Sequence, residues 1–247
     1  MALTGMAAGN YQFLPGGGVL PFCGGVKADA GYEIVHAVMR RPLPWREGFT
    51  AIERHLAGLG RPRTALCAVE LRVSKPYKRE EFFSREGFNG RYGDLLNEWG
   101  LVVDGLGATA RTNIAIDLVP LPEQAIYAFS YTVPAPDAPP TFVVSGVPEG
   151  PNVRPGDNSP EALREKTANI VGTLSQRLEA LGARWEQVTA IGLYTIHDLF
   201  PVLRAEVLAK AGPAGVNGIQ WFAGQPPVEG GAIEIDVRSV QREIRVG

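Results

Sequence analysis

The stretch GATARTNIAI (residues 107–116) places a single arginine, Arg111, at the start of an alternating run of small and β-branched residues. This pattern is typical of a β-strand. A guanidinium held at the start of a strand is a rigid two-pronged donor, which suits a carboxylate. An edge-strand arginine in a surface ion pair explains the same pattern, so the rest of the chain must decide between the two.

Composition limits the possible classes of protein. The chain has 247 residues, of which 45% are apolar and 20% charged, which is the balance of a globular protein of one large or two ordinary domains. A formal net charge of -2 argues against nucleic-acid or membrane partners reached by bulk electrostatics, and it disfavours a ribonuclease. No apolar run approaches the roughly 18 residues that span a bilayer, and no signal peptide is evident. We therefore expect a cytoplasmic protein.

Around the arginine stretch, the first part of the chain alternates between strand and helix patterns. The expected elements are strands at residues 19–25, 32–39, 66–73, 107–116 and 125–132, a helix at 45–59, and a loop from 75 that leads into a helix through Tyr92 to Trp99. Pro42 and Pro44 are expected to end the second strand.

A proline-rich segment, PAPDAPP at residues 134–140, divides the chain near its middle, because it disfavours both helix and sheet. Beyond it we expect strands at residues 141–146, 188–196, 219–222 and 232–237, and helices at 158–181 and 199–210. Ser159 is the expected N-cap of the longer helix, with Pro160 at its first position. We therefore predict a first domain at 1–133, a linker at 134–140 and a second domain at 141–247.

The two halves repeat the same order of elements. GLG followed by LCAVEL (residues 58–71) matches ALG followed by VTAIGL (residues 180–193), with the same spacing between helix end and strand. Phe22-Cys23-Gly24 matches Val144-Ser145-Gly146, and Ala125-Ile126-Tyr127 matches Ala232-Ile233-Glu234. Identities are few, so the case for an internal repeat depends on element order and glycine placement.

Each half resembles the RidA/YjgF family of imine and enamine deaminases. In the second half the resemblance is carried by Ser145-Gly146, LEALGARWEQV (178–188), YTIHD (194–198) and Pro226-Pro227 followed by IEIDV (233–237). In the first half it is carried by Arg111-Thr112, by Leu121-Pro122 and by NGRY (89–92). The resemblance implies an α+β fold of two tandem RidA-like, chorismate-mutase-like domains, each a mixed sheet packed with helices. It also implies a homo-oligomer with threefold symmetry, a trimer or hexamer.

The same resemblance implies a composite site. In the family an arginine holds the substrate carboxylate, and a glutamate near the last strand positions or activates water. The first half supplies the arginine as Arg111 and has Tyr127 at the glutamate position. The second half supplies Glu234 and has IQWF (219–222) at the arginine position. We therefore expect Arg111 and Glu234 to meet across a domain or subunit interface; a pair of relic pockets that serve only assembly is the alternative.

Several further residues are candidates for the site. Glu234 lies between apolar neighbours, so desolvation is expected to raise its pKa and suit it to acid/base work. Asp236 faces the same way on a regular strand, either as a second carboxylate of the site or as a partner for Arg238. The expected substrate-binding residues are Asn89, Arg91, Tyr92, Tyr127, Cys23 and Ser145. The three histidines and two cysteines show no metal spacing, so we expect neither a metal nor a cofactor.

These observations lead to one hypothesis and two rivals. The leading hypothesis is a cofactor-free deaminase that hydrolyses an enamine or imine carboxylate to a keto or hydroxy acid and ammonia. A 2-aminomuconate-like substrate from aromatic-amine catabolism is the specific expectation, with Arg91 and Arg72 as candidates for a second carboxylate. The rivals are a general scavenger of 2-aminoacrylate or 2-iminopropionate, and a non-catalytic protein that binds small acids or serves assembly.

Overall fold

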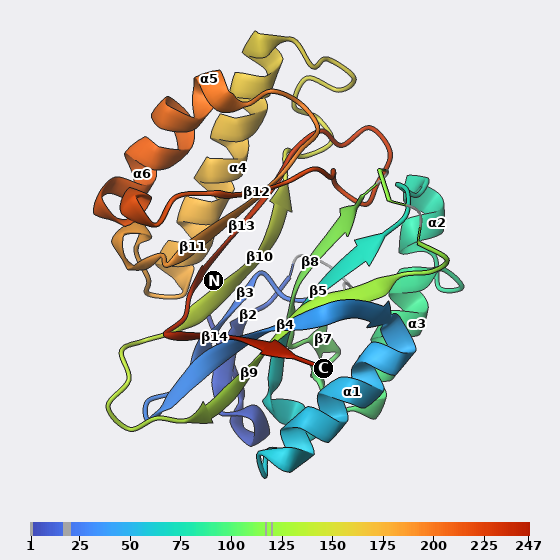
Figure 1. The fold of residues 1–247 in the computed structure, drawn as a ribbon, viewed down its shortest axis with the longest axis vertical. Coiled ribbons are helices and arrows are strands. Elements are labelled where there is room, and N and C mark those ends of the chain that lie inside the picture. The colour runs from blue at the N-terminus through green and yellow to red at the C-terminus, as the bar shows by residue number, and fades with distance from the viewer. Residues whose placement is uncertain (1, 17–20, 117, 120) are drawn as a thin grey trace.

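The computed structural model describes residues 2–16, 21–116, 118–119 and 121–247. Its strands form two large sheets that lie between two groups of helices: α1, α2 and α3 belong to one side of the molecule and α4, α5 and α6 to the other (Figure 1). The mixed α+β class predicted from the sequence is confirmed. No helix within these residues combines the length and apolarity needed to cross a membrane.

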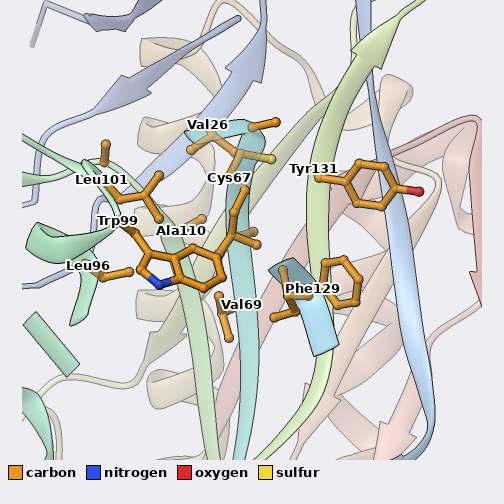
Figure 2. Close-up of a cluster of buried hydrophobic side chains, with 14 of the residues drawn as sticks. Val26, Cys67, Val69, Leu96, Trp99, Leu101, Ala110, Phe129 and Tyr131 are labelled. Carbon is orange, nitrogen blue, oxygen red and sulfur yellow. The ribbon is translucent and has the colours of Figure 1, made fainter. Parts of the chain in front are cut away.

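The first sheet has five strands. Its order is β14 (Arg242–Val246), β4 (Tyr32–Pro44), β9 (Ala125–Pro134), β5 (Leu66–Val73) and β8 (Ala110–Ala115). Helices α1 (Trp45–Gly58) and α3 (Phe88–Glu98) bury their apolar faces in the core beside it. Figure 2 shows part of this core, where Trp99 and Leu96 lie near Val69 of β5.

The second sheet has seven strands. Its order is β1 (Thr4–Met6), β2 (Tyr11–Leu14), β3 (Gly25–Ala28), β10 (Phe142–Pro148), β13 (Glu234–Ser239), β11 (Ala190–Tyr194) and β12 (Gln220–Phe222). Helix α4 (Pro160–Ala180) packs against β10 and β13 through Ile170, Leu174 and Leu178. The hydroxyl of Ser159 accepts a hydrogen bond from the Ala162 N–H at 3.3 Å, which confirms the predicted N-cap.

The remaining elements are short. They are η1 (Ala7–Gly9), η2 (Arg63–Ala65), α2 (Arg79–Phe83), β6 (Val102–Val103), β7 (Leu106–Gly107), η3 (Trp185–Gln187), α5 (Phe200–Val202), the π-helical η4 (Leu203–Leu208), α6 (Ala209–Ala211) and η5 (Gly212–Asn217). Of these, α2 matters most for function, because it places aromatic side chains beside a large cavity.

The sheets exchange strands between the two halves of the sequence. Strands β1, β2 and β3 precede residue 29 but join the sheet of the second half, through the antiparallel pairing of β3 with β10. In return, β14 at the C-terminal end pairs in parallel with β4. The predicted segment 134–140 separates the helices of the two sides, whereas the strand pairing crosses it in both directions.

Four local predictions are wrong. Residues 21–24 of the expected strand at 19–25 are irregular and the strand begins at Gly25, while residues 19 and 20 lie outside the described residues. Strand β4 continues through Pro42 to Pro44, because the pairing with β9 shifts between Val38 and Leu43, where a ladder bond is not required. The expected loop after residue 75 contains α2, and the helix expected at 199–210 is interrupted by the π-helical turn η4.

Candidate active site

A cavity of about 450 Å³ lies where the two sheets and the loop at residues 226–231 come together. Strand β8 contributes Arg111 and Asn113, β10 contributes Gly146, and β13 contributes Glu234. Helix α2 adds Phe82 and Phe83, and α4 adds Lys166 and Arg177. The two halves of the chain therefore build one cavity, and Arg111 and Glu234 both line it.

Arg111 is held rigidly in the wall of this cavity. Its backbone N–H donates to the Ser145 hydroxyl at 3.0 Å, and its Nη1 donates to Asn89 Oδ1 at 2.8 Å. The guanidinium lies 4.2 Å from the ring centre of Phe22 and 5.1 Å from that of Tyr92. Burial lowers the pKa of Arg111 to about 10, which leaves it protonated at neutral pH. Within the described part of the chain it forms no ion pair, so its positive charge is available to an anion.

Glu234 supplies an acid in the same cavity. It is 4% exposed at the start of β13, and burial, followed by repulsion from Asp236, raises its pKa to about 8 despite the opposing attraction of Arg111. The carboxyl is therefore mostly protonated at neutral pH. Gly146 leaves room for it, because a Cβ there would collide with Glu234 Oε1 and lie 2.9 Å from Cδ.

Asp236 lies behind Glu234, outside the lining of the large cavity. Its Oδ2 accepts hydrogen bonds from the Thr112 hydroxyl at 2.7 Å and the Tyr194 hydroxyl at 3.0 Å. Burial, together with Glu70, raises its pKa to about 6. Among the described residues Arg238 forms its ion pairs with Glu70 and Glu243, and its charge also attracts Asp236 and opposes the rise in the pKa of that carboxyl. The Asp236 carboxyl also contributes negative charge beside Glu234.

The other predicted residues fall into three groups, of which two contribute to the site around Arg111. Asn89 and Tyr92 lie against Arg111 and hold it from behind. Cys23 and Ser145 join the strands at the base of the site, where the Ser145 hydroxyl donates to the Cys23 carbonyl at 2.6 Å. Burial raises the pKa of the Cys23 thiol to about 12, so it is not a nucleophile at neutral pH.

Arg91, Arg72 and Tyr127 are not at this cavity. Arg91 is exposed on α3. Arg72 and Tyr127 lie together, with the guanidinium 4.0 Å from the ring centre, in an aromatic cluster beside a different cavity. None of the three residues lines the cavity, although Arg72 is close enough for its charge to act on the pKa of Glu234.

Sequence reasoning missed several lining residues. Asn113 has both amide atoms buried without a partner among the described residues, so it offers a donor and an acceptor to a ligand. Lys166 is 1% exposed, and its Nζ donates to Asn158 Oδ1 at 3.0 Å and lies 3.5 Å from Glu149 Oε1. Its position three residues after Leu163, on the apolar face of α4, is the signal that could have indicated it.

Glu149 and Arg177 are further charged residues of the wall. Glu149 accepts from the backbone N–H groups of Ala232 and Ile233, at 2.7 and 3.2 Å, and so fixes the loop that leads to Glu234. Arg177 donates to the Ser145 carbonyl at 3.1 Å. In the part of the chain that the structure describes, no group of three or more His, Cys, Asp or Glu residues is placed to hold a metal ion.

Comparison with known proteins gives two matches that cover nearly the whole chain. The family model described as 2-aminomuconate deaminase CnbZ matches residues 3–244. A 2-amino-5-chloromuconate deaminase of Comamonas testosteroni is 34% identical over 246 residues, which is 95% of each chain. These matches confirm the prediction of a deaminase that acts on a C–N bond.

Among solved structures the similarity is weaker. A chorismatase crystal structure matches 88% of this chain and 77% of its own, with 14% identity and a TM-score of 0.46. A cyanuric acid hydrolase matches 85% and 69%, with 12% identity and a TM-score of 0.32. At these TM-scores we draw no conclusion from either structure.

Proposed function

Because the chain belongs to the 2-aminomuconate deaminase CnbZ family, we propose that it hydrolyses a 2-aminomuconate-type enamine carboxylate to an oxo acid and ammonia, without a cofactor. One observation supports this mechanism most directly. An arginine without an ion-pair partner among the described residues and a protonated carboxyl line the same cavity, although they are 123 positions apart in sequence. The reaction requires both groups: one to hold the acid, the other to supply a proton.

In the proposed reaction, Arg111 binds the carboxylate next to the amino-bearing carbon. Glu234 donates its proton to the enamine carbon, and the double bond moves to give an iminium ion. The resulting Glu234 carboxylate takes a proton from water while the water oxygen bonds to the iminium carbon. The new hydroxyl then passes its proton to nitrogen, the C–N bond breaks, and ammonia leaves as the carbonyl forms. One water is consumed and Glu234 recovers its proton.

A second cation is proposed for the distal carboxylate of a muconate. Arg91 and Arg72 do not line the cavity, whereas Arg79 does, from the exposed first position of α2. Its guanidinium lies 5.1 Å from the ring centre of Phe83 and forms no ion pair within the described residues. We assign Arg79 the distal carboxylate, with Phe82 and Phe83 against the conjugated chain.

The repeated arrangement and the assembly also remain proposals. Matching strand pairings in the two halves, described below, support a duplicated RidA-like unit. A role in aromatic-amine catabolism and an oligomer with threefold symmetry are the further expectations of that resemblance, and a cytoplasmic location is the expectation from composition. Sedimentation velocity of the full chain tests the oligomer.

The decisive experiment measures ammonia release from freshly generated 2-aminomuconate and, in parallel, from 2-iminopropionate. We expect turnover of the dicarboxylate that Arg111→Ala and Glu234→Gln each abolish, while Arg91→Ala, which removes an exposed arginine away from the cavity, keeps it. Equal turnover of both substrates would indicate a scavenger. If the folded protein releases ammonia from neither substrate, the binding-protein alternative remains. Full activity of Arg111→Ala would refute the proposed site.

A further inference from the structure

A second cavity, of about 220 Å³, lies between the sheets and is separate from the site described above. It is lined by His36, Glu70, Tyr127, Tyr194, Phe222 and Arg238, with further residues of β12 and β14 at its edge. Neither the proposed reaction nor the family match assigns a role to it. Its volume is below the range of pockets for drug-sized ligands, so it suits a small molecule.

The strand pairings identify this cavity as the counterpart of the first. Strand β5 pairs in parallel with β8 and antiparallel with β9, and β9 pairs antiparallel with β4. Strand β11 pairs in parallel with β12 and antiparallel with β13, and β13 pairs antiparallel with β10. The large cavity is lined from β8, β10 and β13, and the second from their counterparts β12, β4 and β9. The duplication therefore yields two equivalent clefts.

The chemistry of the second cleft differs from that of the first. Strand β12 supplies Gln220 and β9 supplies Tyr127, in place of the arginine and the protonated carboxyl. Burial lowers the pKa of His36 to about 4, so it is neutral. Burial of Glu70 opposes its ionisation, but the attraction of neighbouring cations, among them Arg238 and Arg72, outweighs that effect and lowers its pKa. This cleft therefore lacks the acid that the proposed deamination needs.

The acceptors of the second cleft are already engaged by cations. Glu70 Oε2 lies 3.4 Å from Arg72 Nη2, and Arg238 Nη2 donates to Glu243 Oε2 at 2.8 Å and to Gln220 Oε1 at 3.3 Å. The Arg238 side chain is only 6% exposed, yet its Nε is buried without a partner among the described residues. Arg245, at the edge, forms no ion pair in the described part of the chain. A bound acceptor would satisfy both guanidinium groups.

Aromatic side chains also line the second cleft. Phe222 stacks on Tyr194 with ring centres 5.1 Å apart, and Tyr127 meets Phe222 edge-on at 5.9 Å. Aromatic rings together with two guanidinium groups fit a planar molecule with an acidic end. We propose that the second cleft binds a small planar carboxylate and does not transform it.

Binding stoichiometry tests this proposal. Isothermal titration of the full chain uses cis,cis-muconate, a planar dicarboxylate that has no amino group to lose. We expect two equivalents per chain. Arg245→Met should remove one of the two binding equivalents. Gln220→Trp, which fills the cleft from its exposed edge strand, should remove the same one. Arg111→Ala removes the other. Arg242→Met is the matched control, because Arg242 lies on the same strand but pairs with Glu33 at 2.6 Å, and it should keep both.

Two results would overturn the inference. One is a single equivalent in the wild type that Arg111→Ala abolishes. The other is a second equivalent that survives both Arg245→Met and Gln220→Trp. Failure of the proposed function looks different: the Arg111-dependent equivalent would be absent while the Arg245-dependent one persists.

Discussion

Glu234→Gln is expected to abolish activity and to make the protein more stable than the wild type at high pH. Burial and Asp236 raise the pKa of Glu234 to about 8, against a model-peptide value of 4.5. Between these two values the unfolded chain releases the proton and the folded chain keeps it. Wild-type stability from this group is therefore fully present below pH 4.5 and is lost as the pH rises through about 8. The difference corresponds to roughly 3–5 kcal/mol, allowing for local relaxation.

Urea unfolding at about pH 5 and about pH 9 measures this loss. Gln does not titrate, so the variant should gain roughly 3–5 kcal/mol relative to the wild type between the two conditions. Glu229→Gln, which removes an exposed carboxyl from the lining of the same cavity, is the matched control. Parallel stability curves for wild type and Glu234→Gln would mean that the folded protein carries Glu234 ionised. The proposed proton donor would then be wrong.

Three further substitutions test other contacts. Gly146→Ala should lower kcat about 100-fold, because the added Cβ displaces the Glu234 carboxyl. Gly172→Ala is the control and should leave kcat unchanged, because a Cβ there meets nothing within 4 Å. Equal kcat values for the two variants would contradict the proposed effect of Gly146. Lys166→Met should destabilise the fold by about 3–5 kcal/mol in urea unfolding, because its buried carboxylate partner loses a cation at 3.5 Å; a loss below about 1 kcal/mol would refute this. Ser159→Ala should cost about 1 kcal/mol through loss of the N-cap, and an unchanged urea midpoint would show that the cap contributes nothing.

Elements with strong periodicity could be predicted from the sequence. Helix α1 ends at Gly58, within one residue of the expected end, because its apolar spacing and a following glycine specify it locally. Strand β5 matches its predicted span, Leu66–Val73, because its residues are mostly apolar and only Glu70 and Arg72 interrupt them. The exchange of β14 into the first sheet could not be predicted, because its partner β4 is more than 190 residues away in sequence and no local pattern specifies a parallel pairing.

The site was predictable where a side chain is chemically unusual for its place. Arg111 on an apolar strand and Glu234 between isoleucines both indicated function, and both line the large cavity. Arg91 and Tyr127 matched short motifs equally well but lie elsewhere, because motifs record local sequence and not which strand edges meet. Lys166 was missed because helix periodicity treats a single lysine as an interruption of the apolar face.

The two buried carboxyls of β13, Glu234 and Asp236, depend on glycines in the neighbouring strands. Strand β13 lies between β10 and β11, and each neighbour presents a glycine to one of its carboxyls. A Cβ on Gly146 would strike Glu234, and a Cβ on Gly192 would strike Asp236 and lie 2.8 Å from the Tyr194 hydroxyl. Since the two carboxyls repel each other, and this repulsion helps to keep Glu234 protonated, both glycines act on the same pKa. The glycines on the two strands beside β13 thus give the proposed acid the space and the environment that its chemistry requires.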